Sequence, residues 1–182
     1  MHRLTRLLLL AATAACTACG TPGAGQPPLP TVPRVDLARY AGSWYEIALL
    51  PNRFQKQCVA DTQATYRLDG DRVAVLNRCR TADGRVEDIQ GHAKVVPDSG
   101  NARLRVSFFW PIYGDYWIVA LDPDYRHVMV GTPDRGYAWV LSRTPQLDET
   151  VLNGLLDRAA ALGFDRGAFR RTPQTRPLPA AS

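Results

Sequence analysis

The stretch Asp36-Leu37-Ala38-Arg39-Tyr40-Ala41-Gly42-Ser43-Trp44-Tyr45-Glu46-Ile47 decides the fold of this chain. It predicts one short helical turn, then a close backbone approach at Gly42, and then a strand that a large aromatic residue opens. A second stretch far downstream, Tyr137-Ala138-Trp139-Val140-Leu141-Ser142-Arg143-Thr144-Pro145, predicts a strand that ends in an arginine. We interpret the two as the first and last strands of one all-β domain.

Between these stretches the chain, which has 182 residues in all, alternates short strand candidates with turn residues. Clusters of Asp, Gly and Pro such as Asp69-Gly70-Asp71 favour turns. No helical pattern intervenes, so an up-and-down antiparallel sheet is favoured over βαβ units, and closing it into a barrel removes exposed edges. The eight predicted strands are Trp44–Leu49, Ala60–Leu68, Val73–Asn77, Glu87–Val95, Arg103–Phe109, Tyr116–Asp122, His127–Thr132 and Tyr137–Ser142.

One helix is predicted to follow the strands. Asp148 can cap its start, the apolar residues between Val151 and Leu162 recur at helical spacing, and Gly163 stops it. The apolar stripe predicts that this helix packs on the barrel wall. Beyond it, residues 171–182 predict a poorly ordered tail.

Three motifs occur in order along the chain: Gly42-Ser43-Trp44, Asp122-Pro123-Asp124-Tyr125 and Ser142-Arg143. Their order and spacing resemble the lipocalin family over about Val35 to Phe169, and most of all its bacterial outer-membrane lipoproteins and apolipoprotein D. The middle motif departs from the family's Thr-Asp-Tyr turn, because Leu121 stands where threonine is usual and an extra Asp-Pro is present. The resemblance implies an eight-stranded antiparallel barrel over residues 35–170, with a short N-terminal 3-10 turn and one C-terminal α-helix packed on it.

The resemblance also implies roles for single residues. In lipocalins the Gly-x-Trp tryptophan plugs the closed end of the barrel, and an arginine from the last strand packs across it. The implied structural residues are Gly42, Trp44, Asp122, Tyr125 and Arg143. A barrel of eight strands leaves room inside for one small ligand. The resemblance therefore implies a binding protein rather than an enzyme, with a fatty acid or lysophospholipid as ligand and a role in lipid storage, transport or envelope maintenance.

The cavity lining is predicted from strand alternation and from the density of aromatic residues. Glu46 shares a face with Trp44, and it either meets a cationic headgroup or a buried arginine in the cavity, or is a surface carboxylate. Trp139 matches a tryptophan that lines the pocket of similar lipocalins. Aromatic side chains here either suit an acyl chain or form a plain barrel core, and the sequence leaves open which face points inward. The predicted lining residues are Glu46, Tyr66, Phe108, Trp110, Tyr113, Tyr116 and Trp139.

Other classes of function have less support. The net charge of +5 lies largely near the two ends of the chain and forms no basic stripe, which argues against nucleic acid. His92 and His127 are isolated, and the sequence has no nucleophile elbow, carboxylate pair, phosphate loop or metal-ligand spacing, so we expect no cofactor and no metal. Two rival hypotheses remain: a lipocalin-fold enzyme acting on a lipid-like substrate, and a scaffold lipoprotein whose own side chains fill the barrel. A homodimer is also left open.

The N-terminal segment predicts export and a lipid anchor. Residues 1–15 combine a basic start with an apolar run too short to span a bilayer, which is typical of a signal peptide. Small residues before Cys16 resemble a bacterial lipobox and predict lipidation there, with Cys19 as one alternative and a plain secretory signal as another. Cys16 is not followed by aspartate, which favours the bacterial outer membrane. Residues 16–34, rich in Pro and Gly, predict an extended tether.

Two further cysteines, Cys58 and Cys79, lie near the open end of a predicted hairpin whose turn is Asp69-Gly70-Asp71. In an exported protein a disulfide between them is the default prediction. A metal site and a nucleophile are the alternatives, although two thiols without a nearby histidine make a poor zinc site.

Overall fold

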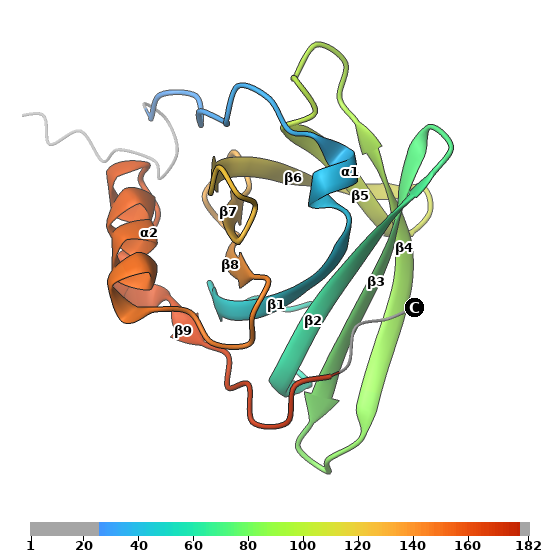
Figure 1. Cartoon of the computed structure of the whole chain (residues 1–182), viewed down its shortest axis with the longest axis vertical. Coiled ribbons are helices and arrows are strands. Elements are labelled where there is room, and N and C mark those ends of the chain that lie inside the picture. Colours follow the sequence, from blue (N-terminus) through green and yellow to red (C-terminus); the bar gives the residue numbers. More distant parts are fainter. Residues whose placement is uncertain (1–25, 179–182) are drawn as a thin grey trace, which may run out of the picture.

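The computed structural model describes residues 26–178, which form a barrel with a helix lying against its wall (Figure 1). The predicted signal peptide, residues 1–15, and the predicted lipidation sites Cys16 and Cys19 lie outside the described residues. Within residues 26–178, no helix has the length and the apolar character needed to cross a membrane.

Eight antiparallel strands of the described chain form the barrel, in the order β2-β3-β4-β5-β6-β7-β8-β1, and pairing between β1 and β2 closes it. Strands that follow one another in sequence are neighbours in the sheet, so the predicted up-and-down topology is confirmed. The strands are β1 (Gly42–Leu49), β2 (Cys58–Asp69), β3 (Arg72–Thr81), β4 (Val86–Val95), β5 (Arg103–Phe109), β6 (Ile112–Leu121), β7 (His127–Gly131) and β8 (Ala138–Ser142). A two-residue strand, β9 (Arg170–Arg171), adds to β1.

The helical elements lie where they were predicted, although the N-terminal turn, predicted as 3-10, is α-helical. α1 (Leu37–Tyr40) is a single turn ahead of β1, and the Asp36 carboxylate caps it by accepting hydrogen bonds from two backbone N–H groups of that turn. α2 (Glu149–Ala161) comes after the barrel and is capped by Asp148 in the same way. A 3-10 turn, η1 (Arg166–Ala168), lies between α2 and β9.

Alternation along the strands divides the apolar residues into an inner core and an outer core. In β6, for example, Ile118 belongs to the inner core and its neighbour Val119 to the outer core. The outer core lies between the barrel wall and α2, where Leu152 and Ala159, both 0% exposed, belong to the same cluster as Met129. The predicted packing of this helix on the barrel wall is therefore confirmed.

β1 and β2 pair over only part of their length. The first half of β1 pairs with β2, whereas its second half pairs with β9. Beyond β9 the chain continues between the two separated strands, where the Thr172 N–H donates to the Ile47 carbonyl (3.0 Å) and the Asp61 N–H donates to the Pro173 carbonyl (2.8 Å). We call residues 170–178 the C-terminal strap.

The strap contradicts the prediction of a poorly ordered tail as far as residue 178. The buried Asp61 carboxylate accepts hydrogen bonds from the backbone N–H groups of Thr175 (2.7 Å) and Arg176 (2.9 Å), and Leu178 is 6% exposed. The physical reason is that β1 and β2 no longer pair here, so their backbone groups need other partners. The strap supplies these partners from a stretch of sequence with no strand pattern of its own.

Residues 26–34 differ from the predicted extended tether. Leu29 is 1% exposed and belongs to the outer core, and the Val32 N–H donates to the Ile118 carbonyl (2.9 Å). Proline keeps this segment out of helices and strands, but it does not prevent the apolar residues between the prolines from being buried. This part of the chain therefore lies along the barrel.

Candidate ligand-binding site

Trp44 closes one end of the barrel. Its side chain is 0% exposed, and its indole N–H donates to the Tyr40 carbonyl (2.8 Å). The Arg143 guanidinium lies 3.8 Å from the centre of the indole and donates to the Ser43 carbonyl (3.0 Å). Gly42 has a φ of +94°, and a Cβ there would lie 3.3 Å from Arg143 Nη1. The geometry thus places these residues in the scaffold, with a cation–π contact that contributes about 0.5–2 kcal/mol.

The turn between β6 and β7 ties this closed end to α1. The Arg126 guanidinium donates two hydrogen bonds to Asp122 (2.9 Å and 3.0 Å), and they lower the pKa of that carboxyl to about 2. The Tyr125 hydroxyl accepts a hydrogen bond from the Asp36 N–H (2.8 Å), and Arg39 stacks on the tyrosine ring at 4.2 Å. Asp122 and Tyr125 therefore hold parts of the scaffold together.

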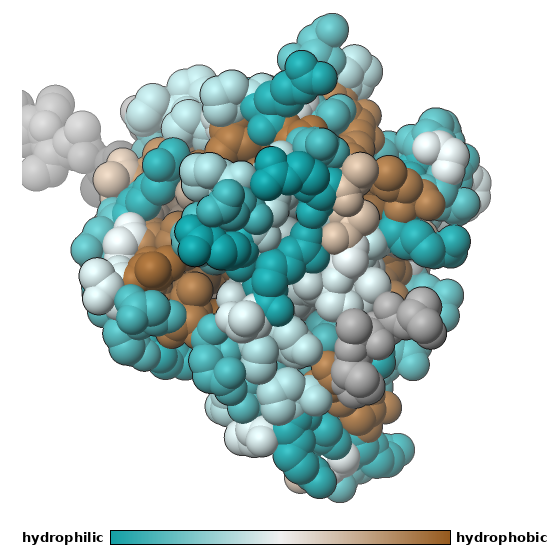
Figure 2. All heavy atoms as spheres, viewed as in Figure 1, coloured by the Kyte–Doolittle hydropathy of each residue, from teal (hydrophilic) through white to brown (hydrophobic). Residues whose placement is uncertain are grey.

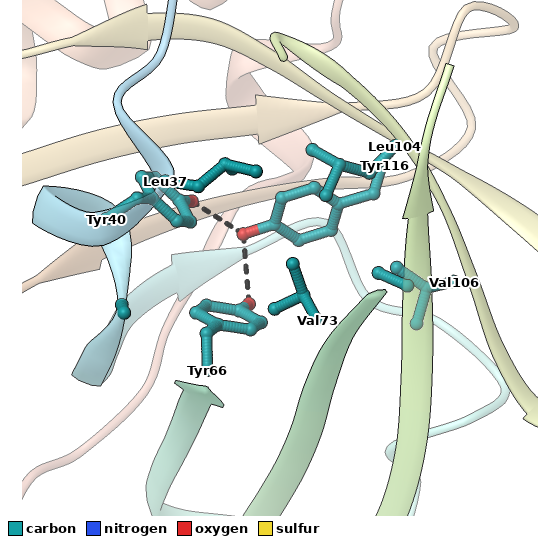
Figure 3. Close-up of a pocket in the computed structure, with 9 residues that line it drawn as sticks. Leu37, Tyr40, Tyr66, Val73, Leu104, Val106 and Tyr116 are labelled. Carbon is teal, nitrogen blue, oxygen red and sulfur yellow. Dashed lines mark hydrogen bonds between the residues drawn. The ribbon is translucent and has the colours of Figure 1, made fainter. Parts of the chain in front are cut away.

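Three tyrosines form a hydrogen-bonded group inside the barrel (Figure 3). The Tyr116 hydroxyl lies 2.7 Å from that of Tyr40 and 2.9 Å from that of Tyr66. Burial raises the pKa of Tyr66 to about 12 and the pKa values of the other two well above 10, so all three stay protonated at neutral pH. The pocket beside them has a volume of about 10 Å³. That is room for about one water molecule, so this part of the barrel has no room for an acyl chain in this structure.

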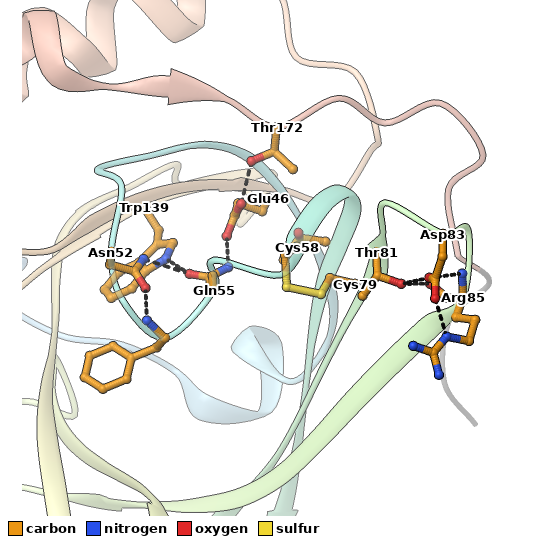
Figure 4. Close-up of a disulfide and its surroundings, with 12 residues drawn as sticks. Glu46, Asn52, Gln55, Cys58, Cys79, Thr81, Asp83, Arg85, Trp139 and Thr172 are labelled. Atoms are coloured by element: carbon orange, nitrogen blue, oxygen red, sulfur yellow. Dashed lines mark hydrogen bonds and ion pairs between the residues drawn. A yellow bond between two sulfur atoms is a disulfide. The ribbon is translucent and has the colours of Figure 1, made fainter.

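Gln55, in the loop between β1 and β2, bridges two of the predicted lining residues (Figure 4). Its side-chain N–H donates to Glu46 (2.8 Å), and its carbonyl accepts from the Trp139 indole N–H (2.8 Å) and from Asn52 (3.0 Å). Glu46 accepts a second hydrogen bond from the Thr172 hydroxyl of the strap. One network therefore connects the loop, the last barrel strand and the strap.

Glu46 is a buried acid in this network. It is 3% exposed, and burial raises the pKa of its carboxyl, while the hydrogen bonds from Thr172 and Gln55 act in the opposite direction. Both partners are neutral, and Glu46 forms no ion pair with a cation of the described residues. The structure thus excludes the interpretation of Glu46 as a surface carboxylate.

Five of the seven predicted lining residues point into the barrel: Glu46, Tyr66, Phe108, Tyr116 and Trp139. Phe108 packs against the inner core beside Gly91, where a Cβ would lie 2.7 Å from the phenylalanine ring. The Ser107 carbonyl oxygen would be closer still, at 2.5 Å, so Ser107 and Phe108 together exclude a side chain at position 91.

The other two predicted lining residues do not face the cavity. Tyr113 and Tyr116 are three positions apart in the same strand, β6, so they lie on opposite faces. The Tyr113 hydroxyl lies instead 2.8 Å from the His92 ring nitrogen. Trp110 lies in the turn between β5 and β6 and is 79% exposed. The sequence pattern failed here because the alternation assumed for β5 does not continue through this turn.

Cys58 and Cys79 form a disulfide between β2 and β3, with 5.5 Å between their Cα atoms. The predicted pairing is confirmed, and neither cysteine is a free nucleophile or a free metal ligand. Across residues 26–178, no group of three or more His, Cys, Asp or Glu side chains is placed to hold a metal ion.

Gln55 and Thr172 are two site residues that were not predicted from the sequence. Both lie in segments without helical or strand periodicity, and a polar residue in a loop carries no signal that it turns inward. Only the closed barrel brings them to Glu46.

Comparison with known proteins agrees with this architecture. The family model of the lipocalin-like domain matches residues 35–174. The temperature-induced lipocalin-1 of Arabidopsis thaliana is 41% identical over 150 residues, which cover 78% of this chain and 80% of that protein. The outer membrane lipoprotein Blc of Escherichia coli K12 is 41% identical over 168 residues, which cover 89% and 93%.

Solved structures show the same fold. Insecticyanin from the tobacco hornworm Manduca sexta has a TM-score of 0.70 at 24% identity, and the match covers 86% of this chain and 89% of that one. The family match spans most of the described residues, and the Trp44–Arg143 stack closes the barrel as the sequence motifs implied. The chain belongs to the lipocalin family.

Proposed function

We propose that this lipocalin binds a fatty acid or a lysophospholipid inside its barrel and serves in lipid storage, transport or envelope maintenance. The observation that carries the proposal is the Gln55 bridge between Glu46 and Trp139, a small polar link beside an inner core of apolar and aromatic side chains. Such side chains suit an acyl chain. The Gln55 side chain belongs to a loop, so a ligand can displace it. The three tyrosines, in contrast, are held in place by two barrel strands and α1.

In this binding mode the acyl chain of the ligand displaces the Gln55 side chain and occupies its position. The pocket of about 10 Å³ at the tyrosine group offers no room, so the chain lies between that group and the loops. Withdrawal of Gln55 breaks three hydrogen bonds, each with a net value of about 0.5–1.5 kcal/mol. Each buried methylene contributes about 0.8 kcal/mol, so the chain of a common fatty acid more than offsets this loss.

Trp139 fluorescence is expected to report binding. A long-chain fatty acid or a lysophospholipid should shift its emission saturably, because the ligand displaces the Gln55 carbonyl from the indole N–H. Affinity should rise about fourfold per methylene and then level off when the barrel is full. The measurement is a titration over chain lengths on delipidated protein, with Trp139→Phe to identify the signal. Gln55→Ala removes the side chain that the ligand displaces and should bind about tenfold more tightly. A lack of saturable response at every length would favour the scaffold hypothesis, in which side chains fill the barrel.

We also infer that the chain is anchored to a bacterial outer membrane through an acylated Cys16. The small residues before Cys16 support this, as do relatives named outer membrane lipoprotein in Escherichia coli and Citrobacter freundii. We expect cells fed a fatty-acid analogue to label the protein, and the label to disappear in Cys16→Ser. Retention of the label until Cys19 is also replaced would move the site to Cys19. Label that survives replacement of both cysteines would show that there is no such anchor.

A further inference from the structure

A second cavity opens where β1 and β2 separate. It has a volume of about 270 Å³, and its walls come from β1, the β1–β2 loop, the start of β2 and the strap. Small-molecule pockets usually have about 300–1,000 Å³, so this cavity has the size for a small polar group rather than for a whole lipid. We call it the side window. It is distinct from the pocket at the tyrosine group, with which it shares no lining residue.

The floor of the side window contains a carboxyl group without a counter-ion and a hydroxyl group without a hydrogen-bond partner among the described residues. Glu46 is 3% exposed and accepts hydrogen bonds only from the neutral side chains of Gln55 and Thr172. Thr62 is 7% exposed, and its hydroxyl has no hydrogen-bond partner within residues 26–178. Buried polar groups are almost always paired, and a buried carboxylate without a cation is costly. The floor therefore lacks a positively charged hydrogen-bond donor.

The rim of the side window has the opposite character. Lys56 and Arg170 are exposed lining residues, and neither forms an ion pair with a carboxylate of the described chain. The Arg170 guanidinium donates only to backbone carbonyls of the preceding three residues. The third rim cation, Arg171, is already paired with Glu149. The rim therefore lacks an anion.

We propose that the side window binds a zwitterionic group that carries both an ammonium and a phosphate, as phosphoethanolamine does. The ammonium would contact Glu46 and Thr62, and the phosphate would contact Lys56 and Arg170. A molecule with a positive and a negative end satisfies both halves of the window at once, whereas a simple anion serves only the rim and a simple amine only the floor. The inference rests on the proposed function, since it assigns the polar end of an amphiphile whose chain occupies the barrel. Leu49 and Val59, which also line the window, offer apolar contacts for the carbons between the two charges.

Soluble probes test the window without an acyl chain. We expect glycerophosphoethanolamine to bind the full-length protein saturably in isothermal titration calorimetry, and inorganic phosphate and ethanolamine each to bind at least tenfold more weakly. Binding should weaken as salt is added, because the rim cations are exposed. Phosphate that binds as tightly as the zwitterion would reduce the window to an anion site, and ethanolamine that does so would reduce it to an amine site. Either result, or no binding of any probe, overturns the proposal.

Variants separate the two halves of the window. Glu46→Gln and Thr62→Val should remove the preference for the zwitterion over phosphate, whereas Lys56→Ala with Arg170→Ala should abolish phosphate binding. Arg53→Ala is the matched control, because it removes an exposed cation of the same loop that does not line the window, and it should bind like the unmodified protein. An unchanged preference in both floor variants contradicts the proposal.

The acyl-chain titration keeps this test independent of the proposed function. A saturable Trp139 response to fatty acids together with no probe binding would overturn the side window and leave acyl binding in place. Probe binding together with no Trp139 response at any chain length would keep the window and overturn acyl binding.

Discussion

Trp44→Ala is expected to lower the free energy of unfolding by about 3–5 kcal/mol. The indole is 0% exposed, lies 3.8 Å from the Arg143 guanidinium and donates a hydrogen bond to the Tyr40 carbonyl. Truncation leaves a cavity at the closed end. It also removes the aromatic partner of a guanidinium whose pKa burial already lowers. Urea denaturation followed by far-ultraviolet circular dichroism measures the loss.

Trp110→Ala is the matched control for this prediction. It makes the same chemical change at a tryptophan that is 79% exposed, and it should alter the free energy of unfolding by less than about 0.5 kcal/mol. If Trp44→Ala kept the stability of the unmodified protein and lost only ligand binding, Trp44 would be a ligand contact and its assignment to the scaffold would be wrong.

Asp61→Ala is expected to lower the free energy of unfolding by about 3–5 kcal/mol, which is the usual cost of removing one partner of a buried ion pair. Asp61 is 0% exposed and accepts a hydrogen bond from Arg80 Nε (2.7 Å), besides those from Thr175 and Arg176. The substitution leaves the Arg80 guanidinium without its counter-charge and removes the anchor of the strap. Denaturation curves measure the first effect. Limited trypsin digestion with mass spectrometry measures the second, through new cleavage after Arg171, which is followed by Thr172.

The same carboxyl predicts a pH dependence of the strap. Burial by itself would raise the pKa of Asp61, but the hydrogen bonds from Arg80, Arg176 and Thr175 prevail and hold it below the usual 3.8. A carboxyl with a lower pKa in the folded state stabilises the fold above its unfolded pKa, and this stabilisation is lost as pH falls through the folded pKa. The strap should therefore become protease-sensitive only below about pH 3.8 in the unmodified protein.

Asp71→Ala is the control for both effects, because the Asp71 side chain is 90% exposed. It should keep the stability and the acid-induced release of the unmodified protein. A strap that stays protected from trypsin in Asp61→Ala at neutral pH would show that other contacts hold it and that the Asp61 assignment is wrong.

The strand content of the barrel was predictable from sequence because alternation and turn chemistry are local properties. All eight predicted strands and the helix are present, yet their boundaries moved where pairing outweighed propensity. β6 begins at Ile112 rather than at the predicted Tyr116, because Gly114 and Asp115, both weak strand formers, pair with Val106 and Arg105 of β5.

The lining of the site was predictable only in part. Period-two alternation placed Glu46 on the same face as Trp44, and the structure puts both inside the barrel. The pairing between β5 and β6 shifts register between Val106 and Phe109, and no local pattern signals such a shift. Phe108 therefore points inward while Trp110, two positions on, faces solvent.

Short-range patterns in the chain are thus sufficient for the strands, the turns, the helix cap at Asp148 and the order of the closed-end motifs, because each depends on residues within a few positions of one another. The Gln55 bridge, the strap on Asp61 and the side window join segments between 9 and 126 positions apart. They exist because β1 and β2 separate before they end, and the backbone and carboxyl groups left unpaired there take partners from wherever the closed barrel brings them. Which partners these are is a property of the packed chain.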